Sequence, residues 1–203
     1  MKRFYLSSPG GSGNTYIQML LNSNAYVDAY MKSHDPRDIL ENEDHLCILR
    51  NPKDAISSIT SKHEKENKDK FIPVDQKVDI SNIEQVKFII SRYCYYHHDF
   101  LKEAVNKKNL FFIKFDYIMN NQEEAIQKLS KQFNFKLHED RKQTMNPDVI
   151  FYRMDQSGLG SRSPKEKSAG REIIDSLIIE DPLYPEIESM YLDILQSTKN
   201  MIQ

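Results

Sequence analysis

The sequence predicts an α/β fold in which helices flank an open parallel sheet. Short apolar runs alternate with amphipathic stretches along the chain, as expected when each strand is followed by a helix that crosses over the sheet. The compact run at 45–49 is typical of a strand that is buried on both faces. The chain has 203 residues, of which 39% are hydrophobic, and this is enough for one sizeable core. We therefore expect a single domain over residues 1–203.

The first predicted strand, residues 3–8, is joined to a predicted helix at 14–22 by a glycine-rich loop. Glycines permit sharp turns and the close approach of an anion, and the first N–H groups of the helix would point at that anion. Compared with the phosphate-loop pattern G-x-x-x-x-G-K-[ST], Asn14 replaces the lysine, whereas Gly13 and Thr15 are in place. We predict a phosphate-binding loop without the lysine used for nucleoside triphosphates. A plain connecting turn is the alternative.

Two further predicted strands end close to this loop. One covers residues 25–34 and ends with Lys32 and His34, and the other covers 45–49 and is followed by Arg50. Because the carboxyl ends of parallel strands meet at one edge of a sheet, we expect these side chains to converge with the loop. Singly, each could be a turn cap, a solvated charge or a surface ion pair. Their convergence predicts a ligand site.

The remaining elements continue the alternation. We predict a short helix within 35–44, a helix that begins at Pro52 with Asn51 as its cap, a long helix from Ser81 to about Lys107, a strand at 110–115, a helix at 123–133 and a C-terminal helix within 182–200. Residues 144–170 are rich in Pro, Gly, Ser and Lys and are predicted as a long loop. The core is expected at about 3–135.

Composition narrows the classes of partner and the compartment. The formal net charge is −2 and the pI is near 6.3, so we expect no general affinity for nucleic acid or membrane surfaces. Cys47 and Cys94 lie in apolar or aromatic runs without metal-ligand spacing, which predicts buried, reduced thiols. The N-terminus lacks the apolar length of a signal peptide or membrane anchor, so we expect a cytoplasmic protein. The sequence does not indicate an oligomeric state.

Three segments resemble motifs of the sulfotransferase family, which transfers the sulfuryl group of 3′-phosphoadenosine 5′-phosphosulfate (PAPS) to a hydroxyl or amine. Residues 12–16, Ser-Gly-Asn-Thr-Tyr, are similar to the family's 5′-phosphosulfate loop, P-[KR]-S-G-[TN]-T-W. Residues 32–36, Lys-Ser-His-Asp-Pro, resemble its K-T-H-x-P segment, and residues 50–54, Arg-Asn-Pro-Lys-Asp, resemble its R-N-P-[KR]-D motif. Residues 112–135 resemble the family's strand, turn and final helix. The resemblance implies a P-loop-like sulfotransferase fold.

The resemblance also implies roles for individual residues. His34 would be the general base, Lys32 would stabilise charge beside it, and Arg50 with Ser58 would bind the 3′-phosphate of the donor. The donor would also contact the glycine-rich loop through Gly10, Gly11, Ser12, Gly13, Asn14, Thr15 and Tyr16. A segment close to Arg171 loosely resembles the family's R-K-G-x-x-G segment, and there the contacts would come from Arg162, Lys165 and Lys167.

Gly11 departs from the family pattern, in which a lysine or arginine that contacts the phosphosulfate usually occupies this position. We expect Lys32 to supply the missing charge. Restoring the charge with Gly11→Lys should tighten donor binding, provided that the backbone there does not require a positive φ.

Together these observations predict a nucleotide-binding transferase that moves a sulfuryl group in line from PAPS to a small-molecule or carbohydrate acceptor. Adenosine 3′,5′-diphosphate (PAP) would be the second product, and no metal ion is implied. Two alternatives remain: a P-loop kinase or other phosphotransferase, and a sulfotransferase-like module that binds nucleotide without turnover. Arg50 argues against a kinase, because a strand in this position normally ends in an acidic partner of Mg²⁺. The sequence does not predict the acceptor.

Overall fold

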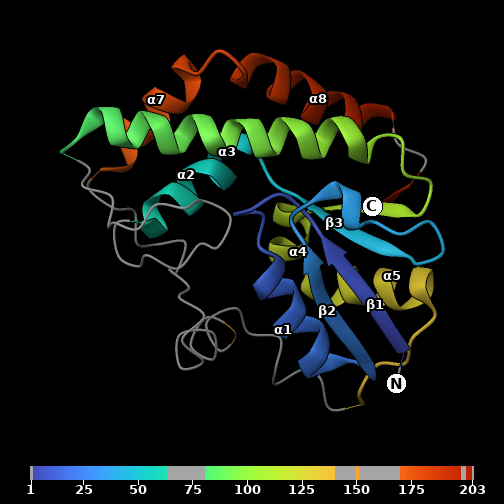
Figure 1. Cartoon of the computed structure of the whole chain (residues 1–203). Helices are drawn as coiled ribbons and strands as arrows, with labels where there is room; N and C mark the ends of the chain where they lie inside the picture. The colour runs from blue at the N-terminus through green and yellow to red at the C-terminus, as the bar shows by residue number, and fades with distance from the viewer. Residues whose placement is uncertain (1, 64–80, 140–149, 151–169, 198–199, 203) are drawn as a thin grey trace.

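The computed structural model describes residues 2–63, 81–139, 150, 170–197 and 200–202. Its five strands form one parallel sheet in the order β2-β1-β3-β4-β5 (Figure 1). The strands are β1 (Lys2–Ser7), β2 (Val27–Ser33), β3 (His45–Leu49), β4 (Leu110–Lys114) and β5 (Met201–Ile202). The predicted open parallel sheet flanked by helices is therefore confirmed.

Helices cover both faces of the sheet. They are α1 (Asn14–Asn24), the short 3₁₀ helix η1 (Pro36–Asp38), α2 (Pro52–His63), α3 (Ile83–Ala104), α4 (Phe115–Asn120), α5 (Gln122–Phe133), α7 (Arg171–Glu180) and α8 (Tyr184–Ser197). In Figure 1, α3, α7 and α8 lie together at the top of the view, and the side chains of α1, α4 and α5 form a separate buried cluster with the sheet. The chain thus forms a three-layer arrangement of helix, sheet and helix.

The pleat of β3 sorts its side chains between the two helical layers. Cys47 and Leu49 belong to the buried cluster that includes α2, α3, α7 and α8, whereas Leu46 and Ile48 belong to the cluster with α1, α4 and α5. Successive strand residues point to opposite faces, so a strand covered on both sides is apolar on consecutive residues. Burial raises the pKa of the Cys47 thiol to about 12, and both cysteines are buried and unpaired, as predicted.

Several element boundaries differ from the sequence prediction. The short helix predicted within 35–44 is the single 3₁₀ turn η1, which the Asp35 carboxylate caps by accepting the Arg37 N–H at 2.9 Å. The long helix is capped by Asn82 instead of Ser81: the Asn82 side chain accepts the Gln85 N–H at 3.2 Å. It also ends at Ala104, a few residues earlier than predicted.

The C-terminal part of the chain contains one predicted helix and one that the sequence did not predict: α8 lies within the helix expected at 182–200, whereas α7 was not expected. Helix α7 packs Ile174 and Ile178 into the same buried cluster as α3, and α8 adds Ile187 and Ile194. The described core therefore continues beyond residue 135. The loop predicted at 144–170 lies outside the described residues, apart from its positions 150 and 170.

A two-residue strand completes the far edge of the sheet. Met201 and Ile202 pair with Phe112 and Ile113 of β4. The Phe112 N–H donates to the carbonyl of Asn200 at 2.9 Å, and the Asn200 amide donates to two carbonyls at the start of β4, each at 3.1 Å. The C-terminal segment is thus tied to the sheet by backbone and side-chain hydrogen bonds. No helix in the described part of the chain is both long and apolar enough to cross a membrane.

Candidate functional site

The glycine-rich loop leaves the sheet between two neighbouring strands. Strand β1 pairs with β2 on one side and with β3 on the other, so the connections that follow β1 and β2 run in opposite directions across the sheet. In open parallel sheets, ligands bind outside the strand ends at such a reversal. The loop therefore occupies the position in the fold where a ligand is expected.

Two glycines of the loop have a backbone conformation that favours glycine. Gly13 has φ = 96°, and a Cβ there would lie 2.4 Å from the ring of Phe115. Gly11 has φ = 79°, and a Cβ there would lie 2.1 Å from the carbonyl oxygen of Ala55 in α2. The condition set for Gly11→Lys is thus not met, and the missing lysine reflects the close approach of the loop to α2.

Three side chains from different elements hold the carbonyl groups of the loop. His34, just after β2, donates from Nδ1 to Ser8 O at 2.6 Å, and Arg50, just after β3, donates from Nη1 to Gly11 O at 2.9 Å. His97 of α3 donates from Nε2 to Gly10 O at 2.9 Å. These hydrogen bonds stabilise this conformation of the loop in the absence of a ligand.

His97 is a site residue that the sequence analysis did not identify. It is 2% exposed, and burial lowers the pKa of its imidazole to about 4, with a smaller contribution from the nearby His34. The ring is therefore neutral near pH 7 and donates from Nε2. No local motif marks His97, but it lies on the buried face of α3, one turn from Tyr93 and Leu101, and a polar residue on such a face is a usable signal.

The hydrogen bond of His34 determines its neutral tautomer. A carbonyl oxygen only accepts, so Nδ1 carries the proton, and in the neutral ring Nε2 carries the lone pair. The tautomer that this hydrogen bond selects leaves Nε2 as the nitrogen that could act as a general base.

A buried amide lies at the start of α1. Asn14 is 4% exposed, and neither its Oδ1 nor its Nδ2 has a hydrogen-bond partner in the described part of the chain. The N-cap of this helix, Gly13, has no side chain to cap the first amides. Unpaired buried polar atoms are costly, so a ligand with acceptor oxygens would stabilise this end of the loop.

Arg50 is a half-buried cation whose charge is only partly balanced. Desolvation lowers its pKa; Asp54 and Asp116 oppose this effect, and Arg171 adds to it. Its guanidinium also lies 5.1 Å from the ring centroid of Phe115. Because burial without full pairing destabilises a charge, an anion beside Arg50 would recover part of the lost solvation energy.

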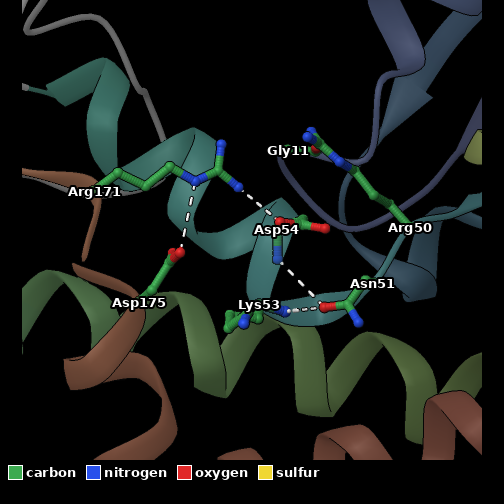
Figure 2. Close-up of polar contacts among 7 residues, drawn as sticks. All are labelled: Gly11, Arg50, Asn51, Lys53, Asp54, Arg171 and Asp175. Carbon is green, nitrogen blue, oxygen red and sulfur yellow. Dashed lines mark hydrogen bonds and ion pairs between the residues drawn. The ribbon is translucent and has the colours of Figure 1, made fainter. Parts of the chain in front are cut away.

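Arg171 brings a second guanidinium to the same region (Figure 2). Its Nη2 lies 2.6 Å from Asp54 Oδ1, and its Nε lies 3.6 Å from Asp175 Oδ2 on the next turn of α7. The side chain of Asn51 caps α2 by accepting the N–H groups of Lys53 and Asp54. The predicted Asn51 cap is therefore confirmed. Asp54 interacts with Arg171 and also with Arg50, which come from distant parts of the sequence.

The remaining predicted site residues lie in the loop and α1, in α2 and β2, and outside the described residues. Ser12 is buried in the loop, and Thr15 follows in α1. Tyr16 is 2% exposed and its hydroxyl accepts a hydrogen bond from Gln122 at 2.5 Å, so its ring packs in the core beneath the loop; a direct contact of Tyr16 with a ligand stays a prediction.

Ser58 is half-buried on α2, two turns beyond Arg50, and its predicted role stays a prediction. Lys32 lies in β2 where the register shifts by one residue, and its side chain lies outside the described part. Arg162, Lys165 and Lys167 also lie outside the described residues.

A cleft opens beside His34. It contains about 530 Å³ of space, part of it open to solvent, and its described lining comes from Pro9 and Gly10 of the loop, residues 34–37, Ile59 of α2, and Tyr93, Tyr96 and Asp99 of α3. Among the described residues, no group of His, Cys, Asp and Glu is arranged to hold a metal ion.

Comparison with known proteins supports the fold assignment. The crystal structure of mouse sulfotransferase SULT7A1 complexed with PAP is similar to this chain, with a TM-score of 0.57 and 12% sequence identity. The match covers 97% of this chain and 89% of the mouse chain. No protein-family model and no curated protein sequence matches. The chain has a sulfotransferase-like α/β fold.

Proposed function

We propose that this protein is a sulfotransferase that uses PAPS to sulfate a hydroxyl, or an amine, of a small-molecule or carbohydrate acceptor. One observation carries the proposal: His34, Arg50 and His97 hydrogen-bond to carbonyls of the glycine-rich loop, for which we propose a role in anion binding, and the bond of His34 leaves its other ring nitrogen as the candidate base. The fold supports it, because the similar mouse sulfotransferase was crystallised with PAP. We further propose that the protein acts in the cytoplasm, which the buried unpaired thiols support.

The described residues fit a nucleotide with phosphate groups. The unpartnered Asn14 amide and the uncapped start of α1 suit a 5′-phosphosulfate. Arg50, with Ser58 two helical turns further on, suits the 3′-phosphate, because an arginine offers a two-pronged contact to phosphate oxygens. We propose that residues 10–16 contact the 5′-phosphosulfate and that Arg162, Lys165 and Lys167 contact the 3′-phosphate.

When bound, PAPS would supply an electrophilic sulfur that gains a bond to the acceptor oxygen as its bond to the 5′-phosphate oxygen breaks. His34 would accept the acceptor proton at Nε2, while its Nδ1–H stays bonded to Ser8 O. The loop amides and Lys32 would stabilise negative charge on the transferred and departing groups. We propose no metal ion for this reaction.

The test compares nucleotides that differ only in the 3′-phosphate. Calorimetry should show much tighter binding of PAP than of adenosine 5′-monophosphate. Because hydrogen bonds to charged groups contribute about 1.5–3 kcal/mol, Arg50→Ala should reduce this preference at least tenfold. Equal affinity of the wild type for the two nucleotides would refute the site.

Transfer itself needs a separate assay with labelled PAPS and a panel of acceptors. PAP binding without transfer to any acceptor class would favour the non-catalytic module. Binding of ATP that depends on Mg²⁺ would favour a phosphotransferase.

A further inference from the structure

The cleft beside His34 has an uneven distribution of charge. Arg37 and Asp35 form a double hydrogen bond, with Nε to Oδ1 at 2.7 Å and Nη2 to Oδ2 at 2.6 Å, and Arg37 lowers the pKa of the Asp35 carboxyl. Asp99, which is half-buried, interacts with the Arg37 guanidinium through space only, without a hydrogen bond or ion pair in the part of the chain that the structure describes. Two carboxylates thus face one guanidinium, and the described lining is negative overall.

Two aromatic rings lie on the same face of α3 as this carboxylate. Tyr93, Tyr96 and Asp99 follow one another at intervals of three residues, so they are neighbours along one side of the helix. Tyr93 is buried and Tyr96 is half-buried. The guanidinium of Arg92, one turn earlier on α3, lies 5.8 Å from the Tyr96 ring centroid, within the range of a cation–π contact.

Aromatic rings next to a carboxylate are the groups that recognise an organic ammonium ion. Such a ligand would pair its charge with Asp99 and place its apolar body against the tyrosines. Its other end would lie in the part of the cleft that His34 lines. An anionic ligand would instead meet two carboxylates that share one guanidinium.

We propose that the acceptor is a small organic cation that carries a hydroxyl group, with its ammonium held by Asp99 and its hydroxyl directed to His34. The inference rests on the proposed function and names the class of acceptor. In the reaction, the hydroxyl oxygen forms the new O–S bond, its proton passes to His34, and PAP leaves with the electron pair of the broken O–S bond.

The test uses three phenols of similar shape and different charge: tyramine, 4-ethylphenol and 4-hydroxyphenylacetate. Transfer from labelled PAPS should give a kcat/KM for tyramine at least tenfold above that for 4-ethylphenol, and the lowest value for 4-hydroxyphenylacetate. Asp99→Asn should bring tyramine to within about threefold of 4-ethylphenol. Glu103→Gln, an exposed charge change one turn further along α3, should leave the preference intact.

Ligand-observed NMR of phenol binding to the PAP-loaded protein tests the acceptor class separately from the proposed sulfotransferase function. Tyramine should bind at least tenfold more tightly than 4-ethylphenol, and Asp99→Asn should abolish the difference without changing the affinity for PAP. This result supports the cation site even without turnover, in which case only the proposed function fails. Equal binding of the two phenols, no binding of either, or a preference that survives Asp99→Asn overturns the acceptor class, whatever the outcome for PAP.

Discussion

Replacing Gly11 with alanine tests the geometry of the loop most directly. A non-glycine residue at φ = 79° costs roughly 1–2 kcal/mol. The new Cβ would also lie 2.1 Å from Ala55 O, whereas ordinary contacts begin at 3.4 Å, so the loop and α2 must separate by about 1 Å. We expect Gly11→Ala to lower the unfolding free energy by at least about 2 kcal/mol, which for a chain of this size lowers Tm by about 4–8 °C.

The same separation moves the carbonyl that Arg50 holds, so the affinity for PAP should fall at least tenfold. Thermal unfolding and calorimetry measure the two effects. Gly10→Ala is the matched control, because its Cβ meets only the mobile end of the Ile59 side chain and its φ is not positive. A Gly11→Ala protein with unchanged Tm and PAP affinity would refute the reasoning, and Gly11→Lys should be at least as damaging as Gly11→Ala.

Three further predictions concern the residues around the loop. His34→Asn should lower turnover on a confirmed acceptor by about 10²–10⁴-fold and leave PAP binding intact, because the asparagine amide can replace the Nδ1–H bond to Ser8 O; full turnover would exclude His34 as the base. His97 stays neutral in the fold, so stability should fall by about 3 kcal/mol as the pH drops from 6.5, the usual pKa, to about 4. Denaturant unfolding of His97→Gln should lack this loss, and an unchanged profile would contradict it. Arg171→Met should weaken PAP binding if both arginines serve one phosphate, whereas Asp54→Asn should weaken it less; the reverse order, measured by calorimetry, would assign Arg171 a purely structural role.

The sequence predicted the features of this fold that depend on local pattern. The glycine-rich turn after β1, the compact strand β3 and the Asn51 cap all have short-range signals in the chain, and each is present. Helix α7 was missed although Ile174 and Ile178 are spaced by one turn, because the segment before it has no regular pattern. Strand β5 has only two residues, which is too short for any periodicity.

The sequence predicted the site residues that lie at strand ends, but it did not predict the contacts that depend on how the helices pack. The placement of Arg50 and His34 follows from topology, since parallel strands end at one edge. The contact of His97 with Gly10 joins residues 87 positions apart, and the fold alone brings them together. The burial of Tyr16 likewise follows from the packing of α1 against Gln122 and Phe115, which its place beside the loop does not reveal.

The attachment of the last few residues to β4 has a consequence for handling the protein. Without Asn200, Met201 and Ile202, strand β4 would become an exposed edge with the sequence Leu-Phe-Phe-Ile-Lys, which is flat, apolar and free of proline. Such edges recruit strands from other molecules. We therefore expect a chain shortened before residue 200 to aggregate during expression. A purification tag after the C-terminal segment would need a flexible spacer, so that Met201 and Ile202 can still pair with β4.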